Sequence, residues 1–155
     1  DAVIKESMRM FPVAPFVVRR LVQDIRVSSK EDVVLPKGAM ACIWIYGLHH
    51  NPNIWPNPDK FDPTRWEHLT KDQHAAFMPF CAGPRNCLGQ PMAHVWLRII
   101  LGTLLQSIVF TDDRLNKDGT NADDLYHDME AGFTILPLGG AKLRVNKRIW
   151  PGGSD

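Results

Sequence analysis

The sequence predicts a mainly helical protein with small antiparallel β-sheets, an α+β fold. Two segments, 1–11 and 88–110, repeat apolar residues at the three- and four-residue steps of an amphipathic helix. Elsewhere, short runs of β-favouring residues are separated by proline and glycine, a pattern typical of antiparallel strands. With 155 residues, of which 45% are hydrophobic and 23% charged, the chain has the size of about one globular domain.

The helix expected at 1–11 ends at Pro12 and Pro15, because proline lacks the amide hydrogen that a helix needs. A small β-sheet is expected at 16–46. Its last two strands should form a hairpin, since proline and glycine separate two apolar runs at 36–38. The expected strands are 16–22, 25–27, 32–35 and 39–46.

The segment 47–79 is expected to be a proline-rich, irregular wrap. Trp55 and Trp66 offer it apolar anchors. Loops of this length inside compact domains are usually functional or disordered, and the aromatic anchors favour an ordered wrap over another part of the structure. The prolines that interrupt the segment are Pro52, Pro56, Pro58, Pro63 and Pro79.

A cysteine loop at 80–89 leads into the longest helix, expected at 88–110. Gly83 allows a tight or positive-φ backbone, and the amides and dipole of the following helix favour a negatively charged sulfur at Cys87. Arg85 adds a permanent positive charge that suits a carboxylate. The loop therefore offers a soft anionic metal ligand beside a site for an anion.

A closing hairpin is expected at 126–148. Its strands are expected at 132–137 and 142–145, because these apolar runs flank a glycine-rich turn.

Charge and cysteine content exclude several classes of protein. The formal net charge of +1 gives no excess for binding nucleic acid, and no apolar stretch reaches the roughly 18 residues of a membrane span. Three cysteines without framework spacing do not indicate a disulfide scaffold and fit a reducing compartment. Cys42 is expected to be a buried, inert thiol. A zinc site at Cys81 and Cys87 is a weaker alternative, because their spacing is not that of paired zinc ligands.

The run Phe-Cys-Ala-Gly-Pro-Arg-Asn-Cys-Leu-Gly at 80–89 resembles the haem-binding loop of the cytochrome P-450 superfamily, whose pattern is Phe-x-x-Gly-x-Arg-x-Cys-x-Gly. The resemblance implies heme b as cofactor, with Cys87 as the axial thiolate of the iron, Arg85 against a haem propionate and Phe80 near the thiolate. Cys81 departs from the family, which usually has a small polar residue or glycine there. The five matching positions are Phe80, Gly83, Arg85, Cys87 and Gly89.

Two upstream runs also resemble the family. On spacing alone, Glu6 and Arg9 would be a surface ion pair that contributes about 0.2–0.5 kcal/mol. The run at 6–9, however, resembles the family's Glu-x-x-Arg motif, and the run at 61–66 resembles its Pro-x-Arg element. The resemblance therefore implies one buried network of Glu6, Arg9 and Arg65.

Further positions take their expected roles from the same resemblance. Arg19, on a predicted strand, is expected to meet a haem propionate. His49 and His50 are expected to be structural residues, with contact near the haem as the alternative. Substrate-lining positions are expected after the first helix and at the tip of the closing hairpin, and their apolar character indicates a small lipophilic substrate. These positions are Val13, Ala14, Val17, Gly132 and Phe133.

The resemblance implies a haem-thiolate monooxygenase that uses O2 and receives electrons from a reductase or a ferredoxin. The family's long central helix has no counterpart in the chain. We therefore expect 1–155 to be a single partial domain, the C-terminal haem-ligating part of a longer parent, with no catalytic residue beyond the haem ligand and no activity alone.

Two alternatives stay open: a haem-thiolate isomerase or dehydratase that needs no reductase, and a truncated, non-catalytic haem-binding fragment. The residues do not define a compartment; the resemblance suggests a parent anchored to the endoplasmic reticulum membrane and facing the cytosol.

Overall fold

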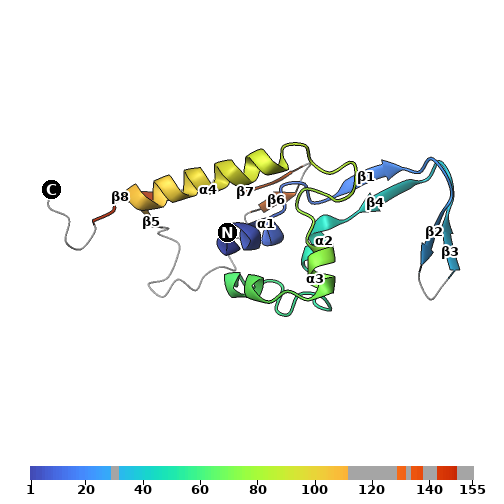
Figure 1. Ribbon diagram of the computed structural model, residues 1–155, viewed down its shortest axis with the longest axis horizontal. Coiled ribbons are helices and arrows are strands. Elements are labelled where there is room, and N and C mark those ends of the chain that lie inside the picture. Colours follow the sequence, from blue (N-terminus) through green and yellow to red (C-terminus); the bar gives the residue numbers. More distant parts are fainter. Residues whose placement is uncertain (29–31, 112–128, 132–133, 138–142, 150–155) are drawn as a thin grey trace. The chain divides into compact units, whose positions relative to one another are not determined.

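The computed structural model describes residues 1–28, 32–111, 129–131, 134–137 and 143–149 (Figure 1). The chain divides into two compact units, one of Ala2–Arg85 and one that runs from Asn86 onward and includes Asp1. Helices and two-stranded antiparallel sheets occur in both, which confirms the α+β prediction. Within the described ranges, no helix combines the length and the apolar character that crossing a membrane requires.

The first unit opens with helix α1, which spans Ala2–Met10. Two of its buried side chains, Glu6 and Arg9, are charged. The helix ends before Pro12, as the sequence predicts, because proline has no amide hydrogen to continue the hydrogen-bond pattern. A short helix thus carries two buried charges that need partners from elsewhere in the unit.

Four strands form a long antiparallel ribbon that bends in the middle (Figure 1). Arg20 lies opposite Met40 at the end of one pair. Ile25 lies opposite Leu35 at the start of the next, so the same register continues across the bend. Between the pairs, the Leu21 amide donates to the Ala39 carbonyl at 2.9 Å. The paired strands are β1 (Val17–Arg20) with β4 (Met40–Ile43), and β2 (Ile25–Ser28) with β3 (Asp32–Leu35).

The hairpin predicted around 36–38 is wrong, because these residues lie at the bend within one arm of the ribbon. Gly38 has φ +85° and its amide donates to the Leu21 carbonyl at 2.8 Å. Pro36 cannot donate to a ladder, so regular pairing is interrupted there. The strand at 32–35 therefore pairs back on β2 and not forward on β4. The proline-glycine signal marks a break in pairing without a reversal of the chain.

Helix α2, Ile45–His49, replaces the end of the strand predicted at 39–46. Ile45 and His49 are four residues apart, and both are fully buried. Residues four apart lie on the same face of an α-helix, so one face of α2 turns both side chains into the core. The β-branched run favours a strand locally, but burial of this helical face decides the conformation.

The segment 47–79 contains more regular structure than predicted. Its 3₁₀ helix η1 spans Pro63–Glu67, and helix α3 spans Lys71–Ala76. At the start of α3, the Thr70 hydroxyl accepts from the Gln73 amide at 3.2 Å, and the Gln73 side chain accepts from the Thr70 amide at 2.9 Å. This Thr-x-x-Gln capping box is a helix signal that outweighs the surrounding prolines.

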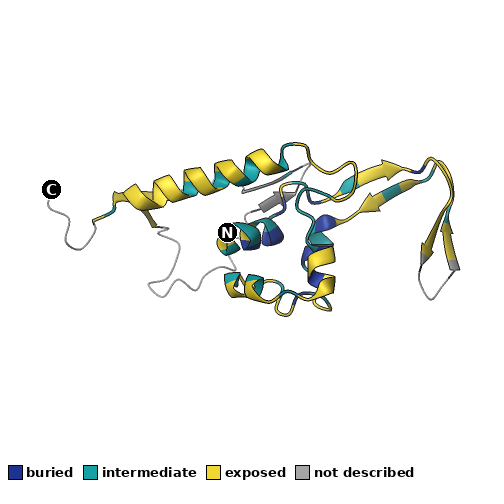
Figure 2. Ribbon diagram, viewed as in Figure 1, coloured by how far each residue is buried: buried dark blue, intermediate teal, exposed yellow. Residues whose placement is uncertain are grey.

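The core of the first unit mixes apolar and polar side chains, and Figure 2 shows its buried segments in α1 and α2. Buried polar groups need hydrogen-bond partners in such a core. The apolar members are Met10, Leu21, Ile45, Trp55 and Ala76. The polar members are Glu6, Arg9, His49 and Gln73.

The second unit begins with helix α4, Gln90–Ser107. It is shorter than the helix predicted at 88–110. At its end, Ile108 enters strand β5 (Ile108–Thr111), whose β-branched and aromatic residues favour extended pairing. None of the described side chains of α4 is buried; its apolar residues are exposed or half-buried (Figure 2).

The strands of the predicted closing hairpin at 126–148 have different partners. Strand β6 (Met129–Ala131) pairs with β7 (Ile135–Pro137), whereas β8 (Arg144–Lys147) pairs with β5. The strand predicted at 142–145 thus finds its partner in β5 and not in the run at 132–137. Glycine and apolar residues indicate strands locally, but the partner depends on distant residues.

Candidate functional site

The cysteine loop begins in a tight turn of the first unit. The Cys81 amide donates to the Met78 carbonyl at 3.0 Å, and Cys81 has φ +65°, in the left-handed region. Gly83 has φ +79°, a conformation that glycine adopts without a steric penalty. Phe80 is half-buried, whereas Arg85 is exposed. The turn thus leaves the guanidinium accessible to an anionic group.

Cys87 lies in the second unit, on an exposed segment directly before α4. Its carbonyl accepts from the Gln90 amide at 3.3 Å, and Gly89 is the N-cap residue of the helix. A Cβ atom added at Gly89 would lie 3.8 Å from the Cys87 Sγ, which is ordinary van der Waals contact. The sulfur is therefore accessible and close to the positive end of the helix dipole.

The donor set at this position is one cysteine sulfur. Where the structure describes the chain, no three His, Cys, Asp or Glu side chains gather in a group that could hold a metal ion. The described residues thus give no support to the zinc alternative. A single thiolate suits a metal whose other positions are filled by a macrocycle, such as haem iron.

Cys42 is exposed, contrary to the prediction that it is buried. It lies on β4 in a two-stranded ribbon, and a ribbon of two strands has little second layer to cover its faces.

Four of the positions predicted to meet a propionate or the substrate lie on or just before β1. Arg19 is exposed, and its Nη1 donates to the carbonyl of the preceding residue at 3.0 Å. Val13 is 66% exposed, whereas Ala14 and Val17 are half-buried. This part of the chain presents an accessible charge and partly accessible apolar side chains. Two further predicted positions lie outside the described residues: Gly132 and Phe133.

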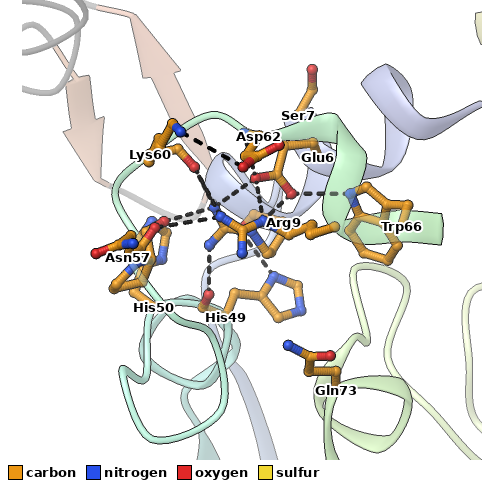
Figure 3. A network of polar contacts seen from close by, with 12 residues as sticks. Glu6, Ser7, Arg9, His49, His50, Asn57, Lys60, Asp62, Trp66 and Gln73 are labelled. Atoms are coloured by element: carbon orange, nitrogen blue, oxygen red, sulfur yellow. Dashed lines mark hydrogen bonds and ion pairs between the residues drawn. The ribbon is translucent and has the colours of Figure 1, made fainter. Parts of the chain in front are cut away.

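Glu6, Arg9 and Arg65 come together within the first unit, and Figure 3 shows the Glu6–Arg9 pair at its centre. Arg9 binds both carboxylate oxygens of Glu6, at 3.0 Å from Nε and 3.0 Å from Nη2. The Arg65 Nε donates to the same carboxylate at 2.9 Å. The side chains of Glu6 and Arg9 are fully buried, so they do not form the exposed pair that their spacing alone suggests.

Glu6 has two further donors that are not apparent from the motifs. The Trp66 indole donates at 3.0 Å and the Asp62 backbone amide at 3.0 Å. Burial raises the pKa of Glu6, but the hydrogen bonds from Arg9, Asp62 and Arg65 and the charge of Arg9 outweigh it and hold this pKa below its ordinary value. The sequence gives one sign of Trp66's part, its position next to Arg65. It gives none for Asp62, whose contribution comes from the backbone.

The two arginines also bind the backbone of the segment 56–60. Arg9 Nη2 donates to the carbonyl oxygens of Pro58 at 2.6 Å and Lys60 at 3.5 Å. Arg65 reaches the Lys60 carbonyl at 3.2 Å and further carbonyls at 3.2 and 3.4 Å, those of Pro56 and Asn57. The fork of donors on each guanidinium allows several bonds at once. The network therefore fixes an otherwise irregular segment against α1.

Aromatic rings pack beside the network. The Trp66 ring lies 5.8 Å from Trp55 and contacts Phe77 edge-on at 4.5 Å between centroids. The Arg9 guanidinium lies 5.5 Å from the Trp55 ring centroid, within the range of a cation–π interaction. Trp55 is fully buried, so these rings keep water away from one side of the charges.

Comparison with known protein families gives a match to the family model described as Cytochrome P-450, over residues 1–125. Among curated proteins, cytochrome P-450 4F5 of Rattus norvegicus is 44% identical over 114 residues, which cover 72% of this chain and 21% of that protein. Cytochrome P-450 4F12 of Homo sapiens is 42% identical over 112 residues, with 71% and 21% covered.

A relative from Drosophila melanogaster, the probable cytochrome P-450 4s3, is 42% identical over 115 residues, which cover 74% of this chain and 23% of that protein. The chain thus spans only about a fifth of the length of the curated relatives that it matches.

Proposed function

Because the chain belongs to the cytochrome P-450 family, we propose that it forms the haem-ligating part of a haem-thiolate monooxygenase. The parent enzyme would insert one atom of O2 into a small lipophilic substrate. Cys87 carries the proposal: its thiol is exposed at the start of α4, within the region that the family model matches. Heme b is the cofactor of the family.

The residues of the cysteine loop suit this cofactor. Cys87 would be the axial ligand, and Phe80 would pack beside its sulfur. Arg85 would meet a propionate, and Arg19 would meet one from β1; both side chains are exposed. Bound haem supplies the chemistry, in which O2 is activated with two electrons so that one oxygen atom enters the substrate and the other becomes water.

The Glu6–Arg9–Arg65 network would have a supporting role in this enzyme. It binds the backbone of 56–60 against α1, and the chain continues from there through η1 and α3 to the cysteine loop. We assign it no contact with substrate or cofactor. Its part is to keep the segment before the loop in one conformation.

Substrate and electron donor follow from the same proposal. Val13, Ala14 and Val17 are apolar and at least partly accessible, which suits a lipophilic substrate. Electrons would come from a reductase or a ferredoxin. The parent would be anchored to the endoplasmic reticulum membrane and face the cytosol.

The reduced carbon-monoxide spectrum of the full-length parent tests the haem ligand. We expect a Soret band at the long-wavelength position of a thiolate complex, and its loss in Cys87→Ala. Cys42→Ala is the matched control, because Cys42 is equally an exposed thiol but lies on β4. A wild-type parent that binds haem without this band would contradict the proposal.

Turnover assays separate the alternatives. A monooxygenase requires O2 and a pyridine-nucleotide-dependent electron donor. Rearrangement of a hydroperoxide without a reductase would instead indicate the isomerase or dehydratase. Haem binding without turnover under either condition would favour the non-catalytic haem-binding fragment.

A further inference from the structure

His49 is a fully buried side chain that contacts both α1 and the chain that leads into the cysteine loop. Its Nδ1 lies 3.1 Å from the backbone oxygen of Arg9, and its Nε2 lies 3.1 Å from the backbone nitrogen of Met78. A carbonyl oxygen only accepts hydrogen bonds, and a backbone N–H only donates them. Together, the two contacts require a neutral ring with its proton on Nδ1 and a free lone pair on Nε2.

The link between His49 and Arg9 runs in both directions (Figure 3). Arg9 Nη1 donates to the His49 carbonyl at 2.8 Å, while the His49 ring donates to the Arg9 carbonyl. The same arginine is paired with Glu6. The ring also stacks on Phe77, with centroids 5.5 Å apart and planes at 28°. These contacts hold the ring in place, so that its acceptor nitrogen faces Met78.

Met78 opens the turn from which the cysteine loop begins. The Met78 amide donates to the His49 ring, and the Met78 carbonyl accepts from the Cys81 amide at 3.0 Å. Phe80 lies inside this turn, and the chain runs on from it to Cys87. Bonds on both sides of Met78 therefore fix where the loop starts.

We infer that His49 is a positioning residue for the thiolate loop: its neutral ring, a donor at one end and an acceptor at the other, holds the turn at 78–81 against the Glu6–Arg9–Arg65 network. This inference rests on the proposed function, in which the loop ligates haem. Protonation of the ring would turn the acceptor into a donor that faces the Met78 N–H and would break the link.

Electrostatics in the unit favour the neutral ring. Burial lowers the pKa of His49 to about 4, although its hydrogen bond to the Arg9 backbone acts in the opposite direction. The charged or titratable groups that face the ring are Arg9 from α1 and His50, the C-cap residue of α2, and both disfavour a positive charge on the ring. Phe77 and Met78, on the other side, carry no titratable group. The link is therefore closed at neutral pH and opens in acid.

Two amide variants separate the two ends of the ring. In His49→Gln, the side-chain oxygen reaches the region of Nε2 and still accepts from Met78. In His49→Asn, the shorter side chain donates near Nδ1 but does not reach Met78. His50→Gln is the matched control, because the His50 Nδ1 bonds to the Tyr46 carbonyl of the same helix at 3.0 Å and not to Met78.

Amide hydrogen exchange at Met78 in the full-length parent is the first measurement, and it does not depend on bound haem. Exchange at neutral pH should be about fivefold to tenfold faster in His49→Asn than in the wild type, and close to wild-type in His49→Gln and His50→Gln. In parent protein labelled with 15N-histidine, the nitrogen shifts of the wild-type ring should show the Nδ1–H tautomer.

The second measurement follows the thiolate-shifted band of the reduced carbon-monoxide complex during acidification. The pH dependence of the loss gives the number of protons taken up as the band disappears. This number should be smaller by about one in His49→Gln than in the wild type. An acid transition identical in the two proteins would overturn the positioning role.

Other outcomes are equally decisive. Met78 exchange that is the same in all variants, or a neutral ring protonated on Nε2, would overturn the link itself. The tautomer is measured on the wild type, so this test stands even if His49→Asn does not fold. Absence of the thiolate band from the wild type, with Met78 exchange as expected, would overturn the proposed function and leave the His49 link intact.

Discussion

At the scale of single residues, the carboxylate of Glu6 accepts five hydrogen bonds from four residues. A buried charge costs several kcal/mol unless it is paired and its lone pairs are satisfied. Arg9 and Arg65 provide the charges, while an indole and a backbone amide complete the shell. The two guanidinium groups depend in turn on this one carboxylate, because no other described ion pair includes either of them.

We therefore expect Glu6→Gln to lower the free energy of unfolding by about 3–5 kcal/mol, since it leaves two arginines without their counter-charge. Urea denaturation of the protein, followed by tryptophan fluorescence, measures the change. Glu67→Gln is the control, because Glu67 is exposed on η1, and it should change stability by less than about 0.5 kcal/mol. Equal effects of the two variants would show that the network contributes little.

Cys81 adopts φ +65° without being glycine. A side chain in the left-handed region costs about 1–2 kcal/mol, which a change to glycine would relieve. Glycine also loses more backbone entropy on folding, and this loss cancels part of the gain. We expect Cys81→Gly to raise the unfolding free energy by about 0.5–1 kcal/mol, measured by the same denaturation.

Cys42→Gly is the matched control for this change. Cys42 lies in the extended strand β4, where glycine only adds entropy to the unfolded chain, so its effect should have the opposite sign. If both variants destabilise the protein, the strain assigned to Cys81 is absent.

At the scale of secondary structure, α3 depends on the capping box at Thr70. We expect Thr70→Ala to destabilise the protein by about 1 kcal/mol, because the Gln73 amide loses its acceptor. Lys71→Ala, at the exposed first position of the same helix, should have almost no effect. Hydrogen exchange should show the loss of protection in residues 71–77. Protection lost only outside this helix would contradict the role given to Thr70.

The sequence predicts most elements of this fold but not their partners. The runs that became β2, β3 and β8 are recognisable from β-branched residues and turn signals. Their pairing is not, because Pro36 interrupts a ladder without reversing the chain, and β8 pairs with the strand after α4. The local sequence predicts a strand where α2 forms, because the burial of Ile45 and His49 depends on packing with distant residues.

At the scale of the whole molecule, two buried groups make stability depend on pH in the same direction. His49 has a pKa of about 4 in the folded state against an ordinary 6.5, so the unfolded state binds more protons between these values. Stability should fall as the pH falls through this window, by at most about 1.4 kcal/mol per pH unit. The pKa of Glu6 lies below its ordinary 4.5, so its contribution is full above pH 4.5 and is lost as the pH falls through its folded value.

Unfolding free energies measured between about pH 7 and pH 4 test this dependence. The loss in the upper window should be smaller in His49→Gln than in the wild type. It should not vanish there, because burial also lowers the pKa of His50, and His50→Gln should likewise keep the part that His49 causes. Stability that rises on acidification from neutral pH would contradict both assignments.

The candidate site is predictable to the extent that its chemistry is local in sequence. Phe80, Gly83, Arg85 and Cys87 lie within one short run, so a motif identifies them together. His49 bonds to main-chain atoms of α1 and of the turn before the cysteine loop. Every residue type has these atoms, so the sequence does not identify such partners. Only the folded arrangement shows that its ring has a donor side and an acceptor side.

The capture of the segment 56–60 by two guanidinium groups has a consequence for sequence variation. Arg9 and Arg65 bind its carbonyl oxygens, which every amino acid possesses, so the segment is recognised by its length and path. Substitutions that preserve the backbone conformation should be tolerated there. An insertion or deletion of one residue would move the carbonyls out of reach, which makes the segment permissive in composition and strict in length.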